Sequence, residues 1–187
     1  MLTIASSVSL IKAFTRFEGT TPAELEFVDR LCQSIDQHLA QLSCQEPNID
    51  WEAHDPALEE CVCLGVWAYT VRILRSVPPA PPGCSYVGHR LMAALTQSEI
   101  LRKWQDHLHL LLWITFMGAC TAVDGPMPLR NWYLFELKSV STLLGTVSWG
   151  EVKPILKNFL WLDRCEDFGK LLWSEIDNFG SAVVHVK

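Results

Sequence analysis

The longest stretch without a charged residue is His107–Val123, which reads HLHLLLWITFMGACTAV. Its seventeen residues include two histidines, a cysteine and two threonines, whereas roughly 20 predominantly apolar residues are needed to span a bilayer. We therefore interpret it as a helix buried in a protein core, with a membrane span as the lesser alternative. A second uncharged run, Cys61–Val71, predicts a central helix that is apolar nearly all round, beginning at Asp55-Pro56 and reaching Arg75.

Capping signals and hydrophobic spacing predict an earlier helix. Thr21 precedes Pro22, and Glu24 stands three residues after the threonine, which is typical of a helix start. The apolar residues that follow recur every three or four positions and predict one helical stripe ending near Ser43: Leu25, Val28, Leu31, Ile35, Leu39 and Leu42.

The second half of the chain is also interpreted as helical. Helices are expected over Tyr86–Leu95, Glu99–Ala122 with a break near Asp106, Leu129–Leu144, Ser148–Leu162 and Cys165–Ile176. The third of these is expected to present a wide apolar face formed by Trp132, Tyr133, Leu134, Phe135, Leu137, Val140 and Leu144. Ser148 and Glu151 form a capping box, and Pro154 should bend the helix or confine its regular part to the C-terminal side.

Proline marks two connections. Four prolines in five positions within Ser76–Gly83 predict a stiff extended connector, with a ligand for an SH3-type domain as a lesser alternative. Pro126 and Pro128 mark a later loop. Because no segment alternates with the period of a strand, the sequence predicts an all-α fold of about eight or nine helices in one domain, 1–187.

Composition narrows the class of protein. The chain has 187 residues, 49% hydrophobic and 19% charged, so a substantial core is required and disorder is excluded. A net charge of −6 argues against a surface that neutralises phosphates. Seven cysteines with no secretory signal before them are expected to be reduced thiols in an intracellular protein. Met1–Phe17 is interpreted as an amphipathic helix, with a mitochondrial presequence as the alternative.

The residues do not form a recognisable catalytic constellation. Gly145–Gly150 is similar to the Gly-x-Ser-x-Gly turn of hydrolases, but Thr146 stands in place of the first glycine and no strand precedes it, so a capping role is favoured for Ser148. His107 and His109 would diverge by about 200° on a helix and cannot clasp one metal ion. No Cys-x-x-Cys pair occurs. The sequence therefore predicts no catalytic residue, no metal ligand and no cofactor.

Tryptophan is unusually frequent. The eight tryptophans are Trp51, Trp67, Trp104, Trp113, Trp132, Trp149, Trp161 and Trp173. Each buries a large area while its indole N–H requires an acceptor. They are interpreted mainly as core residues, with the lining of an aromatic pocket or interface as the alternative.

The second half carries several hydrophobic motifs in a familiar order. They are Leu110–Ala119, Arg130–Tyr133, Trp149–Lys153, and Asn158–Trp161 leading to Leu172–Glu175. Together they resemble the C-terminal part of the fungal-specific transcription factor domain, the regulatory region of fungal zinc-cluster transcription factors. The helix over Leu58–Tyr69 and the proline loop after it are similar more loosely. The resemblance covers 57–177, whereas 1–55 is similar only in being helical.

The resemblance implies an all-helical regulatory domain located in the nucleus, with the cytoplasm as the alternative. It implies protein partners, either a full-length transcription factor or the transcription machinery, and a small-molecule effector as a further ligand. Full-length members hold two zinc ions in an N-terminal cluster of six cysteines that contacts DNA. These 187 residues show no such array, so neither direct nucleic-acid binding nor zinc is expected. The chain is interpreted as a truncated gene product or a stand-alone paralogue.

Two other functional classes stay open at this point. A soluble helical ligand-binding or metabolic protein, enzymes included, would need converging titratable groups such as His89, His107 and Asp124. A small membrane-associated protein would be built on His107–Val123.

Overall fold

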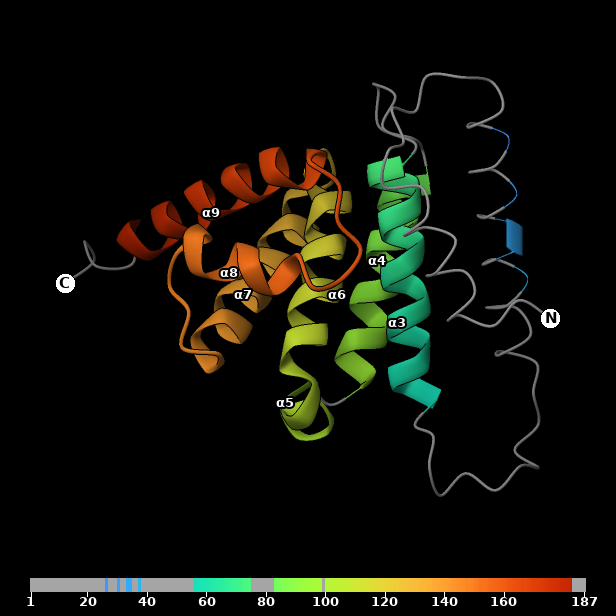
Figure 1. Ribbon diagram of the computed structural model, residues 1–187, viewed down its shortest axis with the longest axis horizontal. Coiled ribbons are helices and arrows are strands. Elements are labelled where there is room, and N and C mark those ends of the chain that lie inside the picture. The colour runs from blue at the N-terminus through green and yellow to red at the C-terminus, as the bar shows by residue number, and fades with distance from the viewer. Residues whose placement is uncertain are drawn as a thin grey trace.

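The computed structural model describes residues 26, 30, 33, 34, 37, 56–74, 83–98 and 100–182. These residues form helices and turns with no strand among them (Figure 1), which confirms the all-α class. The elements are α3 (Pro56–Tyr69), the π-helical turn η1 (Thr70–Leu74), α4 (Gly83–Gln97), α5 (Ile100–Lys103), the 3-10 turn η2 (Gln105–His107), α6 (Leu108–Ala122), α7 (Met127–Leu143), α8 (Trp149–Leu156) and α9 (Arg164–Ala182). The structure does not describe all the residues on which three of the predictions rest. These are the total of eight or nine helices, the stripe ending near Ser43 and the proline connector.

Helix α6 is the central element. Every residue from Leu111 to Ala122 is buried, because α3, α4 and α7 pack around this uncharged helix (Figure 1). The prediction of a buried core helix is thus confirmed. Within the described ranges, no helix is both long enough and apolar enough to cross a membrane.

The uncharged run of α3 is buried in the same way. Between Cys61 and Val71 only Val62 and Trp67 are partly accessible to solvent. Gly65 lets α3 approach α6 closely, since a methyl group added there would lie 3.1 Å from a side-chain carbon of Ile114.

A second close approach joins α4, α6 and α7. The Tyr133 hydroxyl on α7 donates a 2.7 Å hydrogen bond to the carbonyl oxygen of Gly88 on α4. To reach it, the ring crosses α6 at Gly118, where an added methyl group would lie only 2.3 Å from a ring carbon. Glycine at 118 is therefore required by packing, and one tyrosine fastens three helices together.

The structure corrects several predicted boundaries. The chain does break near Asp106, at Trp104 and η2, as expected. Pro128, however, lies in the first turn of α7 rather than in the loop, because first-turn N–H groups have no intrahelical partner and proline costs nothing there. Helix α4 begins at Gly83, and α9 continues past Ile176 to Ala182.

The prediction for α8 was wrong in extent. Its capping box is present, but the helix ends at Leu156 instead of Leu162, and its regular part lies on the N-terminal side of Pro154. Proline supplies no N–H and crowds the preceding turn, yet Pro154 lies inside this helix, which has only two residues after it.

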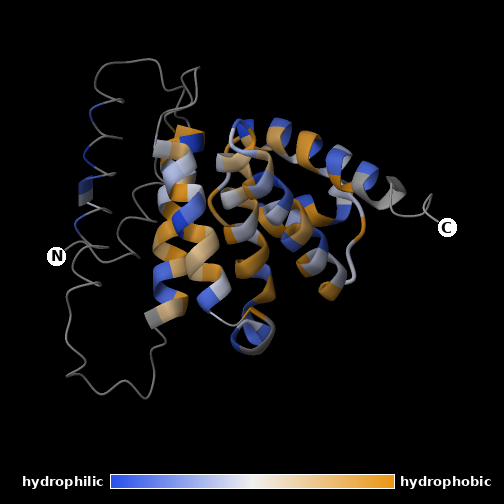
Figure 2. Cartoon of the chain, turned by 180° about the vertical axis from the view of Figure 1, so that it is seen from behind, coloured by the Kyte–Doolittle hydropathy of each residue, from blue (hydrophilic) through white to orange (hydrophobic). Residues whose placement is uncertain are grey.

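Helix α9 packs against α7 and α8, at the side of the molecule away from α3 (Figure 1). Hydrophobic and hydrophilic residues alternate in bands along it, whereas α6 is largely hydrophobic (Figure 2). Its buried residues Cys165, Leu172, Trp173 and Ile176 form the inner face. Its first residue, Arg164, donates a 3.0 Å hydrogen bond to the carbonyl oxygen of Ile73 at the end of η1.

Candidate functional site

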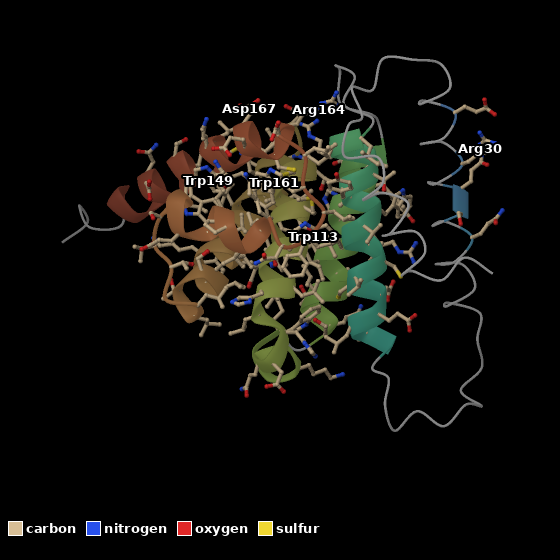
Figure 3. The ribbon with its side chains drawn as sticks, viewed as in Figure 1. Arg30, Trp113, Trp149, Trp161, Arg164 and Asp167 are labelled. Carbon is tan, nitrogen blue, oxygen red and sulfur yellow. The ribbon has the colours of Figure 1, made fainter. Side chains whose placement is uncertain are left out.

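An aromatic cluster occupies the junction of α6, α8 and α9. Trp149 lies with its ring centroid 6.2 Å from that of Trp161, 6.0 Å from that of Phe116 and 5.3 Å from that of Trp173. Trp149 and Trp161 are half-buried and lie beside one another beneath the first turns of α9 (Figure 3). Trp149 also needs Gly169 on α9, because a methyl group there would lie 1.9 Å from the indole ring.

Trp113 on α6 is the centre of a second set of aromatic contacts. Trp113 lies 6.5 Å from Tyr69 and stacks on Phe159 at 5.9 Å between ring centroids. The indole N–H of Trp113 donates to the carbonyl oxygen of Leu160 over 3.1 Å. This fixes the loop that follows α8 against α6.

The structure confirms the core interpretation for part of the tryptophan set. Trp104, Trp113 and Trp173 are buried, while Trp67, Trp132, Trp149 and Trp161 are half-buried and Trp51 lies outside the described residues. The Trp161 indole nitrogen is shielded from solvent and has no acceptor in the part of the chain that the structure describes. The Lys157 ammonium lies 5.9 Å from the centre of the Trp161 ring, a cation–π contact.

Glu166 on α9 is the charged partner of the cluster. Its carboxylate accepts from the Lys153 ammonium at 2.6 Å and from the Trp149 indole N–H at 3.3 Å, with Lys170 at 3.7 Å. The hydrogen bond from Lys153 is the main reason that the pKa of Glu166 falls below its ordinary value. Glu166 thereby joins α9 to α8 through its ion pair with Lys153 and its hydrogen bond from the Trp149 indole.

Arg130 on α7 joins α9 to α7 and to the end of α6. Its guanidinium pairs with both carboxylate oxygens of Glu175, with 2.8 Å between Nε and Oε2. Nη1 also donates to the carbonyl oxygen of Val123 at the end of α6, over 2.7 Å. The bidentate pair is largely shielded from solvent, and such a fork gives geometric specificity as well as energy. The arginine of the Arg130–Tyr133 motif therefore has a structural role.

An open pocket of about 370 Å³ lies at the break between α5 and α6. Three separate segments line it: Gln105–Leu110, Leu144 at the end of α7, and Phe159 in the loop after α8. Its lining is mixed, with apolar side chains such as Phe159, which stacks on Trp113, and polar side chains such as Asp106, His107 and His109. Pockets that bind small organic ligands combine apolar lining with a few polar groups; this one has both, and it stands open to solvent. Sequence reasoning did not anticipate this pocket, because Leu144 and Phe159 are distant in the chain from the residues at 105–110.

The three titratable residues that the enzyme alternative would need to converge, His89, His107 and Asp124, do not lie together. His107 and Asp124 flank the two ends of α6, which is about 22 Å long. Asp124 pairs with Arg72 over 2.7 Å, and the His89 ring bonds to the carbonyl oxygen of Ser85 on its own helix. Ser148 caps α8, and its N–H donates to the Glu151 carboxylate over 3.0 Å. That hydrogen bond fits the predicted capping role.

Three cysteine thiols of the core are poorly suited to nucleophilic chemistry. Burial raises the pKa of Cys63 to about 12 and that of Cys165 to about 11, and it raises the pKa of Cys120 as well. A thiol that stays protonated is a weak nucleophile and a weak metal ligand. Among the described residues no group of three or more histidine, cysteine, aspartate or glutamate side chains is placed to hold a metal ion.

The outer surface of α7 shows a feature that sequence reasoning missed. Tyr133, Leu134, Leu137 and Val140 are buried as predicted, but Phe135 is 66% exposed and so lies outside the expected apolar face. Met127 and Leu143 on the same helix are 61% and 54% exposed. These three side chains are eight residues apart on one helix, so each points about 80° away from the next around its axis.

Comparison with known proteins gives one match. The family model of the fungal specific transcription factor domain matches residues 1–153. The match begins earlier than the expected 57–177 and ends earlier, so it takes in the N-terminal segment and stops before the motifs at 158–161 and 172–175. No match was found among curated proteins or among solved structures.

Proposed function

Because the chain belongs to the fungal specific transcription factor domain family, we propose that it is a helical domain that regulates transcription through contacts with other proteins in the nucleus. The family match, which covers most of the chain, is the observation that carries this proposal. The partners are a full-length transcription factor or a component of the transcription machinery.

The proposal includes a small-molecule effector as the signal. The pocket beside His107 and His109 is the candidate site for it, and Phe159 links that pocket to Trp113 and so to the core. A ligand that favours one of two packings of the aromatic side chains would shift the population between them. The surface available to partners would change accordingly.

A DNA-binding measurement distinguishes the proposed role from that of a domain that itself binds DNA. Fluorescence anisotropy of labelled duplexes, titrated with the chain at low and at physiological salt, should show no sequence-specific binding, because the net charge is −6. A fluorescently tagged chain should accumulate in the nucleus of a fungal cell. Tight, salt-sensitive binding to one duplex, or exclusion from the nucleus, would contradict the proposal.

A further inference from the structure

One face of α3 points away from the two helices on which α3 chiefly packs, α4 and α6. Glu60 pairs with Arg90 of α4 over 3.3 Å, and Gly65 lies against Ile114 of α6. At about 100° per residue, the centre of the third face lies roughly 90° from Glu60 and roughly 130° from Gly65 around the helix axis. We call it the outer face of α3, and its residues are Cys63, Val66 and Thr70.

The outer face is apolar and buried. Cys63 is 4% exposed, Val66 is 5% exposed and Thr70 is fully buried. The Thr70 hydroxyl donates a 2.8 Å hydrogen bond to the carbonyl oxygen of Val66, so its donor is satisfied within the helix and needs no outside partner. Because this face points away from α4 and α6, a further part of the chain covers it.

The segment before α3 contains a helix with the complementary pattern. Glu26, Arg30, Gln33 and Gln37 are helical and exposed, and Glu26 pairs with Arg30 over 3.6 Å. Their spacing of three and four residues places them on one polar side of the helix. The apolar residues of the same segment are centred about 180° away around the helix axis. We call them the N-terminal stripe: Leu25, Val28, Leu31, Ile35, Leu39 and Leu42.

We propose that the N-terminal stripe packs on the outer face of α3. From Leu25 to Leu42 the stripe is about 26 Å long, and α3 with η1 is about 27 Å long, so the two match in length. Residues 44–55 between them can extend over about 40 Å, which is enough to return the chain alongside α3. The family match over residues 1–153 includes both segments. This packing does not depend on the proposed regulatory role.

The thiol of Cys63 reports on whether the outer face is covered. The full chain is alkylated with N-ethylmaleimide under native conditions, and peptide mass spectrometry gives a separate rate for each cysteine. Cys61 is the internal reference, because it is fully buried and lies one helical turn from Gly65, on the side of α6. In the unmodified chain both thiols should react slowly.

Ile35→Asp places a charge in the middle of the N-terminal stripe. It should raise the alkylation rate of Cys63 by about tenfold or more, because burial of one isoleucine favours the packed state by at least that factor. The rate of Cys61 should not change. Leu31→Ala, which adds no charge, should raise the rate of Cys63 in the same direction.

Gln37→Asp is the matched control, because it introduces the same residue into the same helix at an exposed position. It should leave Cys63 slow to react. The proposal is overturned if Cys63 of the unmodified chain reacts as fast as a free thiol, or if both stripe variants leave its rate unchanged. It is also overturned if Gln37→Asp raises that rate as much as Ile35→Asp, or if Cys61 accelerates together with Cys63 in both stripe variants.

Discussion

Replacement of Gly169 by alanine tests how tightly Trp149 joins α8 to α9. The added methyl group would lie 1.9 Å from Cη2 of the indole, 2.2 Å from Cζ2 and 2.5 Å from Cζ3. Ordinary contacts begin near 3.4 Å, so the ring would have to move by about 1.5 Å. It has little room, because Phe116, Trp161 and Trp173 pack around it.

Two effects of opposite sign decide the result. In the middle of a helix, alanine is more favourable than glycine by about 1 kcal/mol. Overpacking costs about 1–3 kcal/mol, and loss of the Trp149–Glu166 hydrogen bond adds roughly 1 kcal/mol. We expect Gly169→Ala to lower the free energy of unfolding by about 1–3 kcal/mol, which at about 2–4 °C per kcal/mol is visible in a thermal melt.

Thermal and urea unfolding, followed by circular dichroism and tryptophan fluorescence, measure this change. Gly150→Ala on α8 is the control, because the nearest atom to its added methyl group is 3.9 Å away, so it should be neutral or stabilising. In a Trp149→Leu background the clash disappears, and Gly169→Ala should then stabilise by up to about 1 kcal/mol. A neutral or stabilising Gly169→Ala in the unmodified chain would refute the packing of Trp149 on α9.

Three further predictions concern charged groups. Arg130→Lys should lower the free energy of unfolding by about 1–3 kcal/mol, since lysine cannot form the bidentate pair with Glu175. A urea midpoint equal to that of the unmodified chain would show that the bidentate pair contributes nothing to stability. Burial raises the pKa of Glu136 above its ordinary value, so its cost to folding grows as the pH rises through the unfolded pKa and is complete above the raised folded pKa. Glu136→Gln should therefore raise the melting temperature at pH 7 but not at pH 4, and an equal shift at both pH values would contradict this. Hydrogen bonds from the Val147 and Ser148 N–H groups lower the pKa of Glu151, so its carboxylate stabilises the folded state above the unfolded pKa and loses that contribution as the pH falls through the folded pKa. Glu151→Gln should therefore weaken the dependence of the melting temperature on pH in this acid range, and an unchanged profile would argue against the capping box.

Much of the helical core follows from the sequence. The uncharged runs Cys61–Val71 and His107–Val123 predict two central helices, because a helix that is apolar all round must be buried by neighbours on all sides. The capping box at Ser148 likewise fixes the start of α8, because its hydrogen bonds are local. The break near Asp106 also follows from local sequence.

Other features depend on contacts between distant residues and could not be read from the chain. Tyr133 and Gly118 are fifteen positions apart, yet their close approach sets how α7 lies on α6. Phe135 sits in a run of apolar residues that local periodicity assigns to the core, although only the placement of α7 against its neighbours decides which of them face water. The pocket beside His107 depends in the same way on Leu144 and Phe159, which reach it through tertiary packing.

A tethered reporter assay tests the regulatory role most directly. The chain is fused to an unrelated DNA-binding domain, expressed in a fungal host, and assayed on a reporter gene that carries sites for that domain. The proposed function predicts that reporter output changes several-fold in either direction relative to the DNA-binding domain alone. A fusion that is expressed, nuclear and bound to its sites, yet leaves the reporter at the level of the DNA-binding domain alone, would contradict it.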